Sequence, residues 1–255
     1  MKFSLIQDSR LGARRVNQDR VGHWRSPESL LMVVADGLGG HLHGEIAAQT
    51  ALDHLEAAFM REACPRLAKP DLFLVRAIAG AHAAILAEAD RRGLSEAPRT
   101  VIVACVVQEG HAHWAHIGDS RLYLVRQGRI LVRTRDHTIV QRLIEEGRIR
   151  EEAAANHPER NRLLQCLGGV QAPHFDPPAS QRLAKHDVLI LCSDGFWGAL
   201  TQRQLVSSLL MHELPQAIPE LVGLAETRAG PQCDNVSVVA MRWDEDADET
   251  ERSAA

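Results

Sequence analysis

Three aspartates lie where apolar stretches of the chain begin or end. Asp36 directly follows LLMVVA, Asp194 follows VLILCS, and Asp234 precedes the run that begins NVSVVAM. Short, continuous apolar runs are typical of buried strands. A carboxylate at the end of such a strand is held rigidly near the core and is still open to solvent. The pattern therefore predicts that these three aspartates converge on one metal site.

The ligand type indicates which metal and which chemistry. Carboxylate oxygens suit Mg²⁺ or Mn²⁺, and the sequence offers none of the Cys or His spacing that zinc prefers. One Asp can bridge two such ions about 3.5–4 Å apart, and a water held between them readily loses a proton and becomes a nucleophile. Arg14, five residues before Asp19, is a candidate to bind a phosphate through two hydrogen bonds. These residues together indicate hydrolysis of phosphate esters.

Each signal also has a simpler interpretation when it is taken alone. Asp-Gly after an apolar strand is a strong hairpin signal, which applies to Asp36-Gly37, to Asp194-Gly195 and, similarly, to the turn around Asp119. The sequence Asn-Gln-Asp at 17–19 is also compatible with an Asx turn. Arg14 is equally compatible with solvated surface charge. Only the combination of these signals favours a metal site.

The elements that would position these residues follow from the hydrophobic periodicity. Strands are predicted at 2–7, 21–24 and 30–35, with a polar loop at 8–20 after the first. Two helices follow, one burying Ala48, Leu52, Leu55 and Phe59, the other burying Leu72, Val75, Ala79, His82 and Leu86. On this second stripe, His82 is interpreted as a packed core histidine.

From Thr100 the pattern changes to four successive strands, which predict one antiparallel meander up to about residue 134. His111 and His113 alternate with apolar neighbours there and are expected to face solvent. Capped helices are predicted after Thr138 and Thr201, with Gly147 ending the first and Pro219 near the start of a later helix. Further strands are predicted at 188–192 and 236–243.

This order predicts one α+β domain, with sheet packed on sheet and helices outside. The strand-end residues Asp36 and Asp194 are expected on adjacent central strands. We assign residues 1–243 to a single catalytic domain, with a polar excursion at about 148–178 that is expected to be partly helical and partly irregular. The acidic tail 244–255 has few apolar residues and is expected to be disordered.

Composition excludes several classes of protein. The chain has 255 residues, of which 45% are hydrophobic, and a net charge of −4, which gives no footprint for nucleic acid. Its five cysteines include no CxxC pair, which favours reduced thiols in a cytosolic protein. The longest clearly apolar stretch, 101–107, is a strand length and far from a membrane span. No signal peptide is expected, because Asp8 interrupts the first apolar run. A cytoplasmic monomer without membrane insertion is therefore expected.

The ordered set of motifs resembles the metal-dependent serine/threonine protein phosphatases, the type 2C or PPM family, and most of all its compact bacterial members. The resemblance spans nearly the whole chain, from about residue 3 to 241. It is carried, in order, by RxxNQD at 14–19, ADGLGGH at 35–41, GDSR at 118–121, DHT at 136–138, SDG at 193–195 and DN at 234–235. Each motif is weak alone, but the ordered set is highly specific.

The resemblance implies a four-layer αββα sandwich, with two central antiparallel sheets flanked by helices, and a flap at 148–178 beside the site. It also implies a role for each candidate residue. Asp36 would bridge two Mn²⁺ or Mg²⁺ ions, the Gly37 backbone oxygen would bind one of them, and Asp194 and Asp234 would bind the other. Asp19 would hold metal-bound water, Asp119 would contribute to a third metal site, and Arg14 would bind the substrate phosphate.

Three positions depart from the family pattern. Leu38 stands where some relatives have a histidine proposed as general acid, and His41 cannot be given that role without geometry. Gln18 stands where many relatives have Glu, so one metal is expected to bind more weakly. Arg99 replaces a small residue, and its role cannot be assigned from the sequence.

The implied activity is hydrolysis of phosphoserine and phosphothreonine in proteins by a metal-bridging hydroxide, opposing a bacterial Ser/Thr kinase and acting on that kinase or its forkhead-associated substrate. Two alternatives stay open. One is a non-catalytic module of the same fold that binds a phosphorylated partner, whose mark would be the loss of a metal aspartate. The other is a hydrolase of small phosphate esters, which only substrate profiling would separate.

Overall fold

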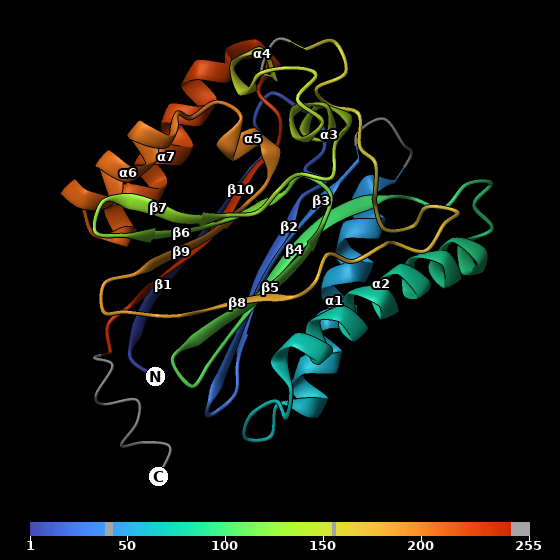
Figure 1. Ribbon diagram of the computed structural model, residues 1–255. Helices are drawn as coiled ribbons and strands as arrows, with labels where there is room; N and C mark the ends of the chain where they lie inside the picture. Colours follow the sequence, from blue (N-terminus) through green and yellow to red (C-terminus); the bar gives the residue numbers. More distant parts are fainter. Residues whose placement is uncertain (39–42, 155–156, 246–255) are drawn as a thin grey trace.

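The computed structural model describes residues 1–38, 43–154 and 157–245. Its strands form two five-stranded antiparallel sheets packed face to face (Figure 1). The first, here the β9 sheet, has the order β1 (Phe3–Arg10), β10 (Val236–Trp243), β9 (Val188–Cys192), β6 (Arg121–Arg126) and β7 (Arg129–Arg133). The second, here the β3 sheet, has the order β2 (Arg20–Arg25), β3 (Ser29–Gly37), β4 (Thr100–Gln108), β5 (His111–Ile117) and β8 (Ala179–Arg182).

Helices cover both outer faces, so the expected four-layer αββα sandwich is confirmed. Two long helices lie on the β3 sheet, α1 (Gly44–Glu62) and α2 (Pro70–Arg92). The β9 sheet is covered by α5 (Asp194–Trp197), α6 (Gln202–Met211) and α7 (Leu214–Ala229), with the 3-10 turn η1 (Gly230–Gln232) after it. The short helices α3 (Ile139–Glu145) and α4 (Glu151–Ala154) lie at one end of the sandwich (Figure 1).

Strand β3 shows why its sequence is apolar at every position. Leu31 and Val33 pack under α1 and α2, while Met32 and Val34 pack between the two sheets. Both faces of the strand are therefore buried, as the continuous apolar run predicted. Asp36 is in phase with Met32 and Val34, so this alternation directs its side chain into the space between the sheets.

The predicted meander is wrong as a single unit. Strands β4 and β5 pair within the β3 sheet, whereas β6 and β7 pair within the β9 sheet. The chain crosses between the sheets at Gly118–Ser120, where Gly118 adopts φ +104°. The placement of Asp36 and Asp194 on adjacent strands is wrong for the same reason, because β3 and β9 belong to opposite sheets. Local periodicity does not tell which sheet a strand joins.

The predicted buried face of the second helix is also wrong. The face of α2 that packs on the sheet includes Leu74, Ile78 and Ile85, whereas Leu72 is 53% exposed. Helix α2 is apolar nearly all round, so spacing alone does not select a face. His82 is buried, as predicted, and its Nδ1 accepts a hydrogen bond from the Gly168 amide at 3.2 Å. The predicted face of the first helix is confirmed.

Smaller differences concern where elements begin and end. Strand β1 extends to Arg10, into the predicted loop, because it pairs with β10 along its whole length. Thr138 and Thr201 cap α3 and α6 as predicted. Pro219 lies inside α7, which begins at Leu214.

Helix α2 is long and apolar enough to span a membrane by length and composition alone, but it packs on the β3 sheet.

Two predicted regions fall partly outside the described residues. The tail prediction for 244–255 concerns mostly residues 246–255, which the structure does not describe, and His41 also lies outside the described residues. Asp244 is described and donates its amide hydrogen to the Lys2 carbonyl at 2.9 Å. Glu245 lies 3.8 Å from the N-terminal ammonium of Met1. The start of the predicted tail is thus held against the first residues of the chain.

Candidate metal centre

Five aspartates from different parts of the chain meet at one end of the sandwich. Asp36 ends β3, Asp194 begins α5 directly after β9, and Asp119 lies in the crossover between β5 and β6. Asp19 precedes β2, and Asp234 precedes β10. The negative charges of the other four all raise the pKa of Asp36. The structure therefore brings together every aspartate that the sequence analysis proposed as a ligand or as a support for one.

The cluster carries more negative charge than the described residues around it compensate. Burial, and then the neighbouring carboxylates, raise the pKa of Asp36 well above its usual range. Burial and the Asp194 charge raise the pKa of Asp119 to about 8. Burial is also the main cause that raises the pKa of Asp194 to about 6, with the Asp234 charge second. Carboxylates held together in this way are expected to share protons or cations.

Asp19 supplies a direct test of whether a cation would fit. Burial raises the pKa of Asp19 to about 6, although hydrogen bonds from Ser237 and Ser193 act in the opposite direction. Its buried Oδ2 atom has no hydrogen-bond partner among the described residues. A buried carboxylate oxygen without a partner is costly unless a cation or an ordered water satisfies it. The donor set of the cluster, carboxylate oxygens only, is the set that Mg²⁺ and Mn²⁺ prefer.

Main-chain contacts fix the Asp36–Gly37 corner. The Thr100 hydroxyl donates to the Asp36 carbonyl at 2.7 Å. The Gly37 amide donates to the Gln18 carbonyl at 3.2 Å. A side chain at Gly37 would collide with the Gly44 carbonyl at the start of α1, so only glycine allows this close approach of strand, loop and helix. The corner is therefore rigid where Asp36 enters the cluster.

Asn235 joins the N-terminal loop to the start of β10. Its Oδ1 accepts from the Gln18 amide at 2.8 Å, and its Nδ2 donates to the carbonyls of Leu11 and Val16 at 2.9 and 3.1 Å. This holds the 11–18 loop against the cluster. Arg14, carried by that loop, donates from Nη2 to Asp234 Oδ2 at 2.6 Å. The predicted phosphate-binding arginine thus lies at the edge of the carboxylate cluster.

The crossover that carries Asp119 is held from two sides. His137 accepts from the Gly118 amide through Nδ1 at 3.1 Å, and its own amide donates to the Gly118 carbonyl at 2.9 Å. On the other side, Trp197 donates from Nε1 to the Asp119 carbonyl at 2.9 Å. Arg121 lies over the Trp197 ring, 3.3 Å from its centroid. The main chain around Asp119 is therefore fixed by side chains of two other segments.

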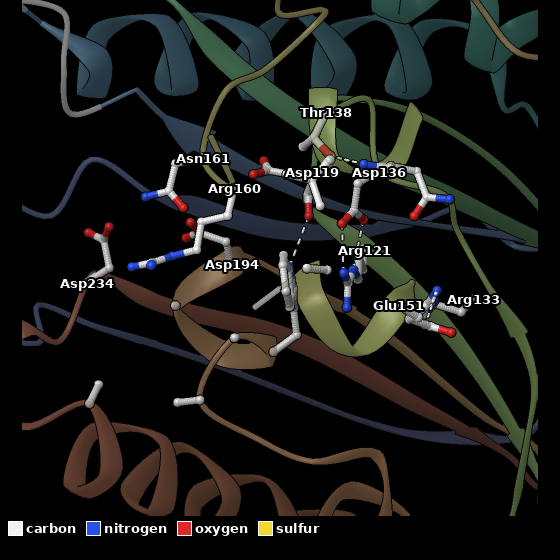
Figure 2. A pocket seen from close by; sticks show the side chains of 18 of the residues that line it. Asp119, Arg121, Arg133, Asp136, Thr138, Glu151, Arg160, Asn161, Asp194 and Asp234 are labelled. Atoms are coloured by element: carbon white, nitrogen blue, oxygen red, sulfur yellow. Dashed lines mark hydrogen bonds and ion pairs between the residues drawn. The ribbon is translucent and has the colours of Figure 1, made fainter. Parts of the chain in front are cut away.

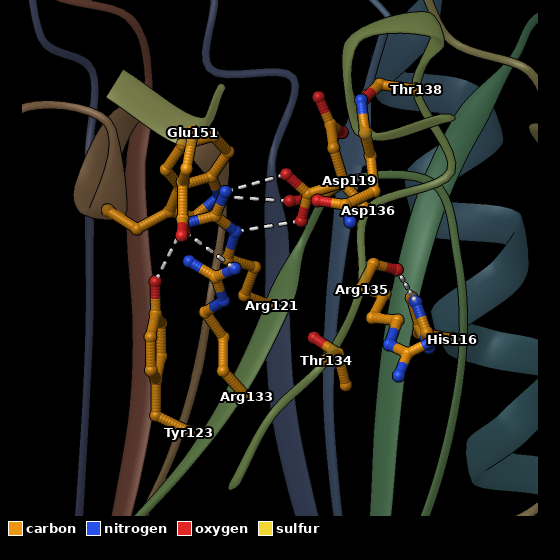
Figure 3. A network of polar contacts seen from close by, with 12 residues as sticks. His116, Asp119, Arg121, Tyr123, Arg133, Thr134, Arg135, Asp136, Thr138 and Glu151 are labelled. Atoms are coloured by element: carbon orange, nitrogen blue, oxygen red, sulfur yellow. Dashed lines mark hydrogen bonds and ion pairs between the residues drawn. The ribbon is translucent and has the colours of Figure 1, made fainter. Parts of the chain in front are cut away.

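Asp136, from the Asp-His-Thr motif, belongs to this supporting network rather than to the cluster. Figure 3 shows Arg121 facing Asp136, to which it donates two hydrogen bonds, at 2.8 and 2.7 Å. Arg121 also donates to the Tyr123 hydroxyl at 3.0 Å. Paired hydrogen bonds of this kind fix the direction of a guanidinium. The network keeps Arg121 over Trp197 and so supports the Asp119 turn.

The three positions that depart from the family pattern have definite surroundings. The side-chain nitrogen Nε2 of Gln18 donates to Glu45 Oε2 at 3.2 Å, so a carboxylate from α1 lies beside this position. The Leu38 amide donates to the Arg99 carbonyl at 3.0 Å. Leu38, which stands where some relatives have a histidine, lines a cavity beside the cluster. Arg99 lines the same cavity.

Two residues at the cluster were missed from the sequence. Figure 2 shows the side chain of Arg160 extending toward Asp194 and Asp234, with Asn161 beside it. Both come from the irregular 148–178 segment, whose sequence has no period that would direct a side chain. Among the described residues, the Arg160 guanidinium has no hydrogen-bond or ion-pair partner. The RN pair followed shortly by Leu-Gly-Gly was the only local signal.

A second group of potential ligands lies apart from the aspartates. His116, His137 and Asp176 each place one ligand atom within 4.8 Å of the others. The two imidazole rings are stacked with centroids 4.5 Å apart, so their in-plane lone pairs cannot readily point at one ion. His137 already accepts from Gly118, and His116 Nε2 lies 2.6 Å from the Arg135 carbonyl. We interpret this group as a support for the crossover.

The chain is similar to known protein phosphatases in both sequence and fold. The family model described as Protein phosphatase 2C matches residues 6–217. The serine/threonine protein phosphatase PstP of Mycobacterium tuberculosis is 35% identical over 82% of this chain, which spans only 39% of that protein. Protein phosphatase PhpP of Streptococcus pneumoniae is 29% identical over 96% of this chain and 99% of its own.

A solved structure shows the same architecture. The catalytic domain of serine threonine protein phosphatase PstP, in complex with two manganese ions, matches 95% of this chain and 99% of its own with a TM-score of 0.81 and 28% identity. The family model covers well over half of the chain, and the sandwich and the carboxylate cluster agree with it. The chain therefore belongs to the protein phosphatase 2C family.

Proposed function

We propose that this protein is a metal-dependent phosphatase that hydrolyses phosphoserine and phosphothreonine in other proteins. The observation that carries the proposal is the cluster of five carboxylates with Arg14 and Arg160 at its edge. Family membership supports it. The first relative named above is much longer than this chain, so the activity, the substrates and the partners are all part of the proposal.

The cluster would hold two Mn²⁺ or Mg²⁺ ions. We assign Asp36 as the ligand shared by both, the Gly37 carbonyl oxygen to one ion, and Asp194 and Asp234 to the other. Asp119 would contribute to a third, weaker site. When bound, the ions would supply Lewis-acid activation of water and charge stabilisation of a phosphoryl group. The rigid corner at Asp36–Gly37 favours this role, because metal sites need ligands that are already in place.

The remaining residues would act on the substrate and on water. Asp19, with its partnerless buried oxygen, would accept a hydrogen bond from the attacking water and orient it. Arg14 would bind two oxygens of the phosphate and offset their charge. The ion pair of Arg14 with Asp234 holds the guanidinium at the edge of the cluster, where the substrate phosphate would bind. Leu38 cannot donate a proton, so the leaving group would take its proton from water in the site.

The two alternative functions are less well supported. A non-catalytic phosphoprotein-binding module would have no need of the full carboxylate set, and every one of the five is present in the cluster. Two cavities, of about 690 and 1000 Å³, meet at this cluster and share part of their lining. Their arrangement offers a place for peptide residues on both sides of the reacting phosphate, which a small ester would not need.

The first test measures p-nitrophenyl phosphate hydrolysis with EDTA, Mg²⁺ or Mn²⁺, beside the Asp36→Asn variant. Activity that requires a metal and is lost in the variant supports the site. The second test uses phosphoserine and phosphothreonine proteins, including a Ser/Thr kinase and its forkhead-associated substrate as proposed partners. A folded protein that hydrolyses none of these with any metal would contradict the proposal.

We further propose that the protein is a cytoplasmic monomer. Cell fractionation would test the localisation, and light scattering would test the oligomeric state.

A further inference from the structure

Two grooves meet at the carboxylate cluster, on either side of the 148–178 segment. The α7 groove is the cavity of about 690 Å³ between this segment and helices α5 and α7. The β3 groove is the cavity of about 1000 Å³ between the same segment and the end of β3. Both are lined by Asp119, Asn161, Asp194 and Asp234. A chain passing from one groove into the other would therefore cross the metal centre.

The walls of the α7 groove are positively charged once the cluster is set aside. Four arginines line this groove, against two carboxylates. The Arg121 charge is balanced by Asp136 at 2.7 Å, and the charge of a second arginine, Arg133, by Glu151 at 3.3 Å. Two charges remain, those of Arg160 and Arg228. Arg228 donates to the Ala199 carbonyl and to the Gln204 side chain, which hold the guanidinium in place without neutralising it.

The β3 groove has the same sign of charge. Arg14, Arg99 and Arg162 line it, and outside the cluster no carboxylate among the described residues does so. Arg162 is paired with Glu159 at 2.6 Å, but Glu159 does not itself line the groove. Bound cations would largely offset the carboxylates of the cluster. Both grooves would then present positive walls on a protein whose net charge is −4.

We propose that the two grooves bind the residues on either side of the phosphorylated residue, and that their arginines select acidic flanks. This inference rests on the proposed protein phosphatase function. Complementary charge raises the association rate and excludes partners of the wrong sign. A flank rich in Lys or Arg would be repelled by both walls, whereas Asp or Glu would be attracted. The partner chemistry is thus an acidic phosphopeptide segment.

The experiment compares kcat/KM for four phosphothreonine peptides with the Mn²⁺-loaded protein. One peptide has three Glu on each side, one has three Gln on each side, and two have Glu on one side only. We expect the doubly acidic peptide to be hydrolysed about tenfold more efficiently than the neutral one, which corresponds to a difference of about 1.4 kcal/mol. The preference should shrink as NaCl is raised from 0.1 to 1 M, because the Debye length falls from about 10 to about 3 Å.

Single substitutions assign each flank to a groove. Arg228→Gln in the α7 groove and Arg162→Gln in the β3 groove should each reduce the acidic-to-neutral ratio about threefold, and each should affect only one of the two singly acidic peptides. Arg76→Gln is the matched control, because Arg76 is an exposed arginine of α2 paired with Glu62 and lies on neither groove. The control should keep the wild-type ratio.

Three outcomes would overturn the inference. The first is a ratio near one in the wild-type protein. The second is an equal loss on acidic and neutral peptides in both groove variants, which would show a general effect on the site. The third is the same change of ratio in Arg76→Gln. Absence of hydrolysis for every phosphopeptide would instead contradict the proposed function and this inference with it, whereas hydrolysis without flank preference would contradict the inference alone.

Discussion

Asp36 is a strand residue whose side chain faces four other carboxylates instead of an apolar core. The alternation of β3 turns the side chain inward. The four neighbouring carboxylates all repel its negative charge: Asp19, Asp119, Asp194 and Asp234. Such an arrangement costs folding free energy in the metal-free chain. Cation binding would offset this cost. Removal of one of these carboxylates should therefore lower activity and raise the stability of the metal-free protein.

Replacing Asp36 by Asn tests this opposition. We expect kcat/KM to fall by more than the roughly 10–100-fold that is typical when only a support of a metal ligand is lost. We also expect a higher midpoint of thermal unfolding in EDTA at pH 8, because one of the repelling carboxylates is gone. Calorimetry and steady-state kinetics measure the two effects. A variant that is less stable than the wild type in EDTA would contradict the repulsion argument.

The pH dependence of the metal-free protein follows from the raised pKa values of these carboxyls. A carboxyl whose pKa is higher in the folded chain holds more protons there than in the unfolded chain, so stability falls as pH rises. For Asp19, Asp194 and Asp119 this loss should begin above the usual pKa of 3.8 and continue through about 6 to about 8.

Bound Mn²⁺ replaces the protons and removes this loss. The unfolding midpoint with Mn²⁺ minus that with EDTA should therefore grow from pH 5.5 to pH 8 in scanning calorimetry. Asp36→Asn serves as the reference, since it should show a smaller growth. A difference that stays constant over this range would mean that the carboxyls do not titrate as the structure indicates.

At the scale of elements, His137 connects the crossover from β5 to β6 to the 148–178 segment. His137 binds both the amide and the carbonyl of Gly118, and it also holds the 148–178 segment. Its carbonyl accepts from the Leu164 amide at 2.8 Å, and its Nε2 lies 3.2 Å from Asp176 Oδ2. One side chain therefore ties the Asp119 turn to the segment that forms a wall of both grooves.

His137→Ala should weaken Mn²⁺ binding at the weakest site about tenfold, the lower end of the effect of removing a support of a metal ligand. His82→Ala is the matched control, because His82 also holds the 148–178 segment, through Gly168, but does not touch the Asp119 turn. His137→Asn keeps an acceptor near Nδ1 and should restore part of the affinity. Isothermal titration with Mn²⁺ measures this, and equal losses in the two Ala variants would argue against the role.

The sequence was sufficient for the elements that bear the ligands and insufficient for their assembly. Apolar runs ending in Asp located β3 and β9, and the ordered motifs located Asp19, Asp119 and Asp234. The crossover between sheets was not predictable, because β4 to β7 have the same local pattern whichever sheet they join. Arg160 was missed because an irregular segment has no period, and only tertiary contacts direct its side chain toward the cluster.

At the scale of the whole molecule, the carboxylate cluster joins the two sheets. Asp36 belongs to the β3 sheet, whereas Asp194 and Asp234 flank strands of the β9 sheet. Cations shared by these residues would connect the two halves of the sandwich at one end. Binding that favours the folded state raises its stability according to ligand concentration, and here it should do so for both sheets together.

Hydrogen exchange with and without Mn²⁺ tests this coupling. We expect slower exchange in β3 and in β9 and β10 when Mn²⁺ is present, since global unfolding is the route by which such central strands exchange. The expected change is about tenfold for each additional 1.4 kcal/mol of stability. In Asp36→Asn the effect on both sheets should be much smaller. Protection confined to one sheet would contradict a shared site.

The contact between Met1 and Glu245 indicates where a label, a fusion partner or a surface can be joined to the protein. The N-terminus lies at the end of the sheets away from α3 and α5 (Figure 1), and Glu245 lies beside it. A fluorescent label, a surface linker or a fused binding module joined at either point would leave both grooves open. Immobilised on a sensor through that end, the protein would present the carboxylate cluster and the two grooves to the solution.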